Sequence, residues 1–133
     1  MQIKEEEENL RYLAKHKFDK TFPKLIKSLK GKKVIIYGAG TLFQLIKKHY
    51  GVDGLNIVGI ADRKYETSSE KTSDTGYKIY RLDEITDSDA DCILVSVKFY
   101  TSIIEELYER FKDKKIKVKP LIRKSLWSIL KEL

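Results

Sequence analysis

Apolar residues in the first 31 positions fall into two groups with helical spacing. The first group is Ile3, Leu10, Leu13 and Ala14, and the second is Phe22, Leu25, Ile26 and Leu29. Such spacing places apolar side chains on one face of a helix, so two helices are predicted. Thr21 is the expected N-cap of the second helix, with Pro23 tolerated in its first turn, and Gly31 lies where a helix ends.

After Gly31 the pattern changes to short apolar runs separated by helical segments. Residues 33–37, 57–61 and 91–97 are dominated by β-branched and other apolar side chains, as in strands buried on both faces of a parallel sheet. Helical spacing recurs between the first two runs and again after Thr101, the expected N-cap of that helix. The apolar residues of these two helices are Leu42, Leu45, Ile46 and Tyr50, then Ile103, Ile104, Leu107, Tyr108 and Phe111.

The remaining segments give weaker patterns. Residues 77–80 and 116–119 predict short outer strands, the latter broken by Pro120, and residues 82–85 predict one helical turn. Residues 63–76 are polar with almost no apolar anchor, which predicts a mobile surface loop. A last helix is expected over residues 121–133, with Leu126, Ile129, Leu130 and Leu133 on its apolar face.

Strands that alternate with helices predict a mainly parallel sheet. The expected fold is α/β, a Rossmann-like three-layer fold with about four to five strands plus flanking helices at both ends of the chain. The length of 133 residues is that of one domain. It divides into an N-terminal helical extension (1–31), a β/α core (33–119) and a C-terminal helix (121–133).

Composition and charge narrow the class of protein. An apolar fraction of 41% without any long apolar run predicts a globular protein with no membrane insertion. The chain start lacks a secretory pattern and Cys92 is the only cysteine, so a cytoplasmic location is expected. The net charge of +7 divides into +4 over residues 1–32, −4 over 33–109 and +7 over 110–133. Because the central segment is acidic, a solvated lysine-rich surface is favoured over nucleic-acid binding.

The strongest candidate site is the glycine turn Gly38-Ala39-Gly40, between the first buried strand and its helix. In such units the first glycine permits a tight turn and the second lets the backbone approach a phosphate, which the helix N-terminus attracts. Thr41 and Leu42 open that helix and complete the candidate phosphate contacts. The signal gains weight from its placement between a strand and a helix.

Asp62 and Phe43 refine this expectation. Asp62 ends the second buried strand, 24 positions after Gly38, where a carboxylate accepts hydrogen bonds from ribose hydroxyls. This carboxylate would also repel a 2′-phosphate, and the neighbouring Arg63 weakens that discrimination. The third position of the glycine fingerprint is Phe43 instead of Gly or Ala, and we expect it to push the helix outward or to point away from the sheet. This favours a mononucleotide-sized ligand over a dinucleotide.

A second candidate region follows the third buried strand, in the loop that begins at Ser96. It is expected beside the glycine turn, because ligands of open α/β sheets bind at the carboxyl ends of the strands. Ser96 and Lys98 are its candidate contacts. Lys98 is expected to hold a phosphate, and an exposed loop lysine is the equal alternative.

Other chemical signals are weak. Tyr108 and Lys112 match the Tyr-x-x-x-Lys spacing of short-chain dehydrogenases, but such a match arises by chance in this composition, and a core role suffices for Tyr108. His16 and His49 lack partners at metal-binding spacing, and Cys92 lies within a strand, where an inert thiol is usual. No metal site and no catalytic residue is predicted.

The segments Val34 to Gly40, Ile57 to Asp62 and Tyr77 to Tyr80, with the strand at 91–97, resemble small Rossmann-like domains of bacterial surface-polysaccharide enzymes. Examples are the N-terminal domain of sugar acyltransferases of the sialic-acid O-acetyltransferase type and the coenzyme-binding domain of nucleotide-sugar epimerases and dehydratases. The resemblance covers about residues 33–118. It implies binding of a uridine nucleotide-sugar or NAD(P) at Gly38, Gly40, Thr41 and Asp62.

Three functions remain open at this point. The first is a nucleotide- or nucleotide-sugar-binding module in sugar or polysaccharide metabolism that acts with a partner enzyme or as a homo-oligomer. The second is a minimal NAD-dependent oxidoreductase, epimerase or dehydratase. The third is an interaction protein whose glycine turn is vestigial.

Overall fold

The computed structural model describes residues 3–124. Helices α1 (Ile3–Lys15) and α2 (Phe18–Ser28) precede the unit of β1 (Lys33–Tyr37), α3 (Thr41–His49) and β2 (Asn56–Ala61). The 3₁₀ turn η1 (Arg63–Tyr65), helix α4 (Leu82–Thr86) and strand β3 (Cys92–Val95) follow. Helix α5 (Thr101–Phe111), the 3₁₀ turn η2 (Lys112–Lys114) and strand β4 (Lys117–Pro120) complete the described chain.

The four strands form one sheet in the order β2-β1-β3-β4, and every pair is parallel. The predicted parallel sheet is therefore confirmed. Beyond β2, the predicted strand at 77–80 is reduced to one parallel bridge between Ile60 and Ile79. Its hydrogen bonds join Ile60 N–H to the Lys78 carbonyl and Tyr80 N–H to the Ile60 carbonyl, each at 2.8 Å.

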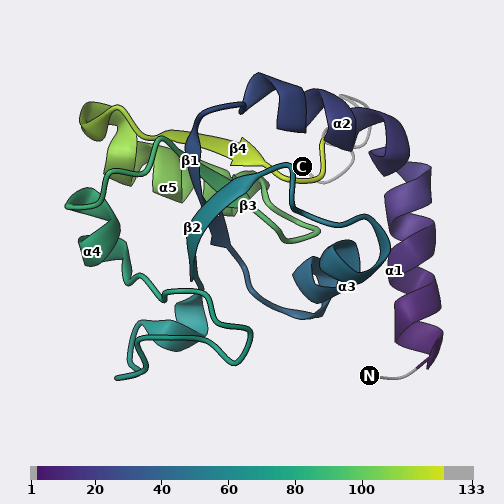
Figure 1. Cartoon of the computed structure of the whole chain (residues 1–133), viewed down its shortest axis with the longest axis horizontal. Helices are drawn as coiled ribbons and strands as arrows, with labels where there is room; N and C mark the ends of the chain where they lie inside the picture. The colour runs from purple at the N-terminus through teal and green to yellow at the C-terminus, as the bar shows by residue number, and fades with distance from the viewer. Residues whose placement is uncertain (1–2, 125–133) are drawn as a thin grey trace.

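Helices cover both faces of the sheet, which makes three layers, as predicted (Figure 1). Successive residues of β1 alternate between the two faces, because side chains of a strand point in opposite directions in turn. Val34 and Ile36 pack with α1, α2 and α3, whereas Ile35 packs with α4 and α5. The largest buried side chains on the first face are Leu13, Phe18, Phe43, Leu45 and Ile46, and on the second Ile85, Ile93 and Phe111.

The helix starts differ from the predicted ones. Lys17 adopts a left-handed conformation (φ 54°) that separates α1 from α2, so α2 begins at Phe18 and Thr21 lies inside it. Thr101 is likewise the first residue of α5, and not its N-cap. The expected place of Ile3 on the apolar face of α1 is also wrong, since its side chain is 76% exposed.

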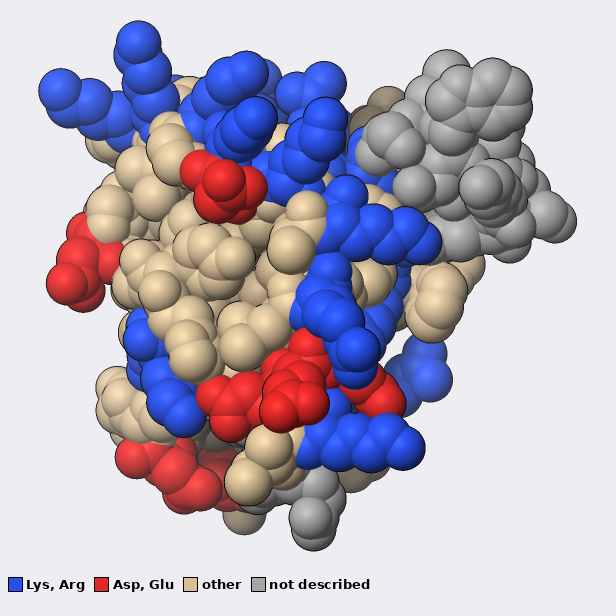
Figure 2. All heavy atoms as spheres, turned by 90° about the vertical axis from the view of Figure 1, so that its right-hand side faces the viewer, with Lys and Arg blue, Asp and Glu red and all other residues tan. Residues whose placement is uncertain are grey.

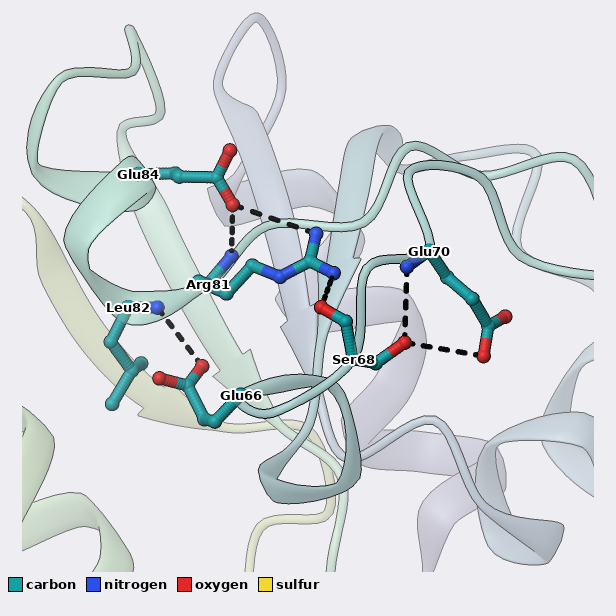
Figure 3. A network of polar contacts seen from close by, with 6 residues as sticks. All are labelled: Glu66, Ser68, Glu70, Arg81, Leu82 and Glu84. Carbon is teal, nitrogen blue, oxygen red and sulfur yellow. Dashed lines mark hydrogen bonds and ion pairs between the residues drawn. The ribbon is translucent and has the colours of Figure 1, made fainter.

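The polar segment after β2 is anchored, contrary to expectation. Tyr65 is buried against the α3 side of the core. Figure 3 shows how Arg81, just before α4, reaches back to this segment. Its guanidinium donates to the Ser68 carbonyl, and the Leu82 N–H donates to Glu66 Oε2 at 3.1 Å. These contacts hold residues 66–68 against the start of α4.

Residues 121–124, the first part of the predicted C-terminal helix, are not helical. Instead, the Leu121 N–H donates to the Val95 carbonyl at 3.0 Å and continues the pairing of β4 with β3. The rest of that prediction lies outside the described residues. Within residues 3–124, no helix is long and apolar enough to cross a membrane.

Candidate functional site

A cavity of about 330 Å³ lies at the carboxyl ends of β1 and β3. The chain passes from β1 to β2 on one side of β1 and later forms β3 on the other side of β1. The strand order therefore reverses between β1 and β3. Open α/β sheets bind ligands at this reversal point. The residues that line the cavity are Glu5, Asn9, Gly38, Gly40, Thr41, Leu42, Asp62, Ser96, Val97 and Lys98.

Gly38 is required by the fold. Its φ of +100° is one that side-chain-bearing residues rarely adopt. A Cβ at this position would lie 3.0 Å from Val97 Cγ1 and 3.1 Å from the Ser96 carbonyl oxygen. Its N–H donates to the Ala61 carbonyl at 2.8 Å. The first glycine therefore lets the turn after β1 pack against the loop after β3.

Neither the backbone conformation nor a close neighbour requires a glycine at position 40. Its φ of −84° is ordinary, and a Cβ built there would meet nothing within 4 Å. Gly40 caps α3 and borders the cavity, where the first N–H groups of the helix have no partner within the helix. Gly40 thus leaves space beside the first N–H groups of α3, at the positive end of the helix.

Asp62 supports the glycine turn from β2. Its Oδ2 accepts a hydrogen bond from the Ala39 N–H at 2.9 Å, and its Oδ1 accepts one from the Lys64 N–H at 3.1 Å. The Ala39 N–H is therefore occupied, and phosphate donors must come from residues 40–42. Asp62 also lines the cavity, so its remaining lone pairs are available to hydroxyl groups.

Two buried polar side chains in the cavity wall lack protein partners. Ser96 is 3% exposed, and its hydroxyl has no hydrogen-bond partner among the described residues. Asn9 of α1 is 4% exposed and has no side-chain hydrogen bond within residues 3–124, but its amide atoms are not fully buried, so they reach the cavity or solvent. Leaving a buried polar group unpaired costs about 1–3 kcal/mol, so such groups usually face water or a ligand.

Helix α1 is fixed over the cavity by polar contacts. Glu6 Oε1 lies 2.8 Å from His49 Nε2 and 3.1 Å from Lys48 Nζ on α3. The Tyr12 hydroxyl donates to the Lys98 carbonyl at 3.0 Å, in the loop after β3. Figure 2 looks onto this side of the molecule and shows acidic side chains gathered low on the face, with basic side chains above them. Helix α1 therefore links α3, which follows β1, to the loop that follows β3.

Most of the residues predicted for the site meet in this cavity. They are Gly38, Gly40, Thr41, Leu42, Asp62, Ser96 and Lys98. Ala39 instead lines a separate cavity of about 240 Å³ near residues 73–75. Arg63 is exposed in η1 and lines neither cavity. Glu5 and Asn9 of α1 also line the cavity and were not predicted to do so, whereas Val97 lies in the predicted loop after β3.

Phe43 does not point away from the sheet. It is completely buried among the residues that α3 packs on the β2 edge, and its ring centroid lies 6.2 Å from that of Tyr77. The segment after β2 thus supplies an aromatic neighbour for the large side chain. Phe43 occupies core space and leaves the cavity free.

A larger cavity, of about 520 Å³, lies between α2 and the end of β4. Of its cations, Lys24 and Arg123 are exposed and Lys119 is half-buried, and the cavity lies away from the glycine turn and from the strand reversal. Size alone therefore does not make it the functional site.

Cys92 and Tyr108, the other side chains with reactive groups, do not line the cavity at the strand reversal. Burial raises the pKa of the Cys92 thiol to about 11, and the residue is 2% exposed. Tyr108 is 57% exposed, so the core role expected for it is wrong. It lies near the end of α5, and the cavity lining does not include it. Among the described residues, no three His, Cys, Asp or Glu side chains are grouped to hold a metal ion.

Comparison with known proteins places the chain. No curated protein matches the sequence. Residues 30–118 match the family model described as C2185-like, N-terminal, which covers β1, the glycine turn, β2, β3 and the first half of β4 but not α1. The chain belongs to this C2185-like N-terminal family.

Proposed function

We propose that the cavity at the strand reversal binds a nucleotide or nucleotide-sugar of mononucleotide size. The proposal rests on the presence of both Gly40 and Ser96 in the wall of this cavity. A glycine that the fold does not require and a buried hydroxyl with no hydrogen-bond partner within residues 3–124 face one cavity at the start of α3. A ligand phosphate accounts for both, since it needs close backbone approach and accepts hydrogen bonds.

The donors for that phosphate lie on one side of the cavity. They are the N–H groups at the start of α3, from Gly40 to Leu42, and the Ser96 hydroxyl. Lys98 adds a positive charge in the loop after β3, with its ammonium 5.1 Å from the Tyr12 ring centroid. Charge-assisted hydrogen bonds of this kind are about twice as strong as neutral ones.

The size of the cavity favours a mononucleotide over NAD(P). Its volume of about 330 Å³ is at the lower end of the roughly 300–1,000 Å³ found for small-molecule sites. A nicotinamide dinucleotide adds a second nucleoside to a nucleoside diphosphate and so needs more room. A binding module is thereby favoured over a minimal NAD-dependent enzyme.

The biological setting follows from the resemblance to domains of bacterial polysaccharide enzymes. We propose that the protein acts in the bacterial cytoplasm, in sugar or cell-surface polysaccharide metabolism. We also propose that it acts there with a partner enzyme or as a homo-oligomer.

Isothermal titration with UDP, UDP-glucose and NAD tests the proposal. We expect saturable binding of the uridine ligands and weaker binding of NAD. Gly40→Glu places a carboxylate against the phosphate and should abolish binding. The matched control is Asn56→Glu, which adds the same charge at the exposed amino end of β2. Absence of binding to all three ligands would favour the vestigial alternative and overturn the proposal.

A further inference from the structure

We infer that α1 recognises the sugar of a neutral nucleotide-sugar through Asn9 and Glu5. The inference rests on the proposed function, and it adds a residue pair outside residues 30–118, the part of the chain that the family model matches. Asn9 and Glu5 are four positions apart on α1, so they share one face of the helix. Both line the cavity.

The side chain of Asn9 borders the cavity and has no hydrogen bond within residues 3–124, so its amide can bind a ligand. It lies one turn before Leu13, on the face of α1 that packs into the core, and is 4% exposed. A carboxamide offers two donors and one acceptor, which suits hydroxyl groups that both donate and accept. A sugar ring carries such hydroxyls on adjacent carbons.

Glu5 supplies a charged acceptor beside Asn9. Its Oε1 accepts a hydrogen bond from the Thr41 hydroxyl at 3.2 Å, and its Oε2 has no partner among the described residues. A carboxylate accepts hydrogen bonds from hydroxyls but repels a second phosphate or a ligand carboxylate. Because Glu5 also contacts Thr41, its carboxylate borders the start of α3, so a phosphate lies on the side of the cavity formed by Ser96 and Lys98, away from α1.

This division of charge orients the ligand. The phosphate lies on the side of Ser96 and Lys98, and the uncharged sugar lies under α1. The Glu6 contacts to α3 and the Tyr12 contact to the Lys98 carbonyl keep α1 in place, so Asn9 and Glu5 are positioned before the ligand arrives. Preorganised polar groups lose less entropy on binding and so favour selectivity.

The test compares UDP with neutral and acidic UDP-sugars by isothermal titration. We expect UDP-glucose or UDP-N-acetylglucosamine to bind about tenfold more tightly than UDP, the effect of one or two net hydrogen bonds. UDP-glucuronate should bind more weakly than either neutral sugar. Glu5→Gln should remove the discrimination against UDP-glucuronate, and Asn9→Ser should reduce the neutral-sugar preference to less than about threefold.

Glu7→Gln is the matched control. Glu7 is exposed on the same helix, carries the same charge and does not line the cavity, so its change should leave every affinity as in the wild type. If wild type binds UDP and the neutral UDP-sugars equally, or if both variants keep its preferences, the inference is overturned and the proposed function stands. If wild type binds no uridine ligand, both fall.

Discussion

The side chain of Asp62 accepts a hydrogen bond from the backbone N–H of Ala39 at 2.9 Å, which ties the end of β2 to the turn after β1. The same carboxylate holds the Lys64 N–H at the start of η1. In the sequence, Asp62 is a candidate ribose contact. In the structure it also fixes the conformation of the glycine turn, so its substitution affects the shape of the cavity as well as its chemistry.

Replacing Asp62 by Ala should lower the free energy of unfolding by about 1–2 kcal/mol, because the partly buried Ala39 N–H loses its charged acceptor. Asp62→Asn keeps one acceptor oxygen and should cost less. Urea denaturation followed by circular dichroism measures both. Equal stability of Asp62→Ala and wild type would show that the hydrogen bond does not organise the turn.

The two glycines of the turn should respond differently to alanine. Gly38→Ala should cost about 2 kcal/mol of unfolding free energy, because its positive φ is unfavourable and its Cβ meets Val97 and the Ser96 carbonyl. Gly40→Ala has an ordinary φ and open space, so only a helix-cap preference of less than about 1 kcal/mol is lost. Thermal and urea unfolding of the two variants give the comparison. A larger cost at Gly40 would contradict the structural division between them.

The change in periodicity made the central fold predictable. Buried β-branched runs and an amphipathic helix of 3.6-residue period identify β1, α3, β2 and β3 without any tertiary information. The carboxyl ends of parallel strands must then share one edge, so Gly40, Asp62 and Ser96 were expected together. Helix starts were less predictable, since the backbone of Lys17, and not a capping side chain, sets the start of α2.

The contribution of α1 to the site was not predictable from the pattern alone. Periodicity shows which face of α1 is apolar, but not which part of the sheet it covers. The signal that was available is Asn9 itself, a polar residue one turn before Leu13 on the core-facing side. The burial of Phe43 was not predicted for a related reason. The glycine fingerprint describes only the turn and its helix, and not the later segment with Tyr77 that packs near Phe43.

Arg81 should control the order of residues 66–71. Arg81→Ala removes the guanidinium that contacts the Ser68 carbonyl and Glu84. We expect faster amide hydrogen exchange and proteolysis in this segment, with the global unfolding free energy changed by less than about 1 kcal/mol. Arg110→Ala, which removes an exposed partner of Asp83, is the control and should leave the segment unchanged. Unaltered exchange in Arg81→Ala would show that Tyr65 and the Glu66–Leu82 hydrogen bond anchor the segment without Arg81.

Cys92 should be unreactive in the folded protein. Because burial raises the pKa of the Cys92 thiol from its ordinary 9.0 to about 11, the thiolate fraction at pH 8 is about a hundredfold lower. A thiol-specific chromogenic reagent should label the protein only after denaturant is added. The contribution of this thiol to stability is lost as the pH rises from 9.0 towards 11, since the unfolded chain releases the proton first. Cys92→Ala should remove that part of the pH dependence, and rapid labelling of native protein would contradict the burial.

Glu6 should titrate below its ordinary value, and His49 should be the main reason. The hydrogen bond from His49 and then that from Lys48 lower the pKa of Glu6 from 4.5. The stabilisation by this carboxylate is complete above 4.5 and is lost as the pH falls through the lowered pKa. Carbon-detected NMR of the Glu6 side chain measures the midpoint directly.

The two partners of Glu6 make this prediction specific. His49→Ala should move the Glu6 midpoint back towards 4.5 further than Lys48→Ala does, because the contact with His49 is the shorter at 2.8 Å against 3.1 Å. Lys47→Ala, on the same helix, makes no contact with Glu6 and should leave the midpoint unchanged. Because this contact also holds α1 against α3, a wild-type midpoint at 4.5 would mean that α1 is not fixed there in solution, and the cavity would then lose the wall that carries Asn9.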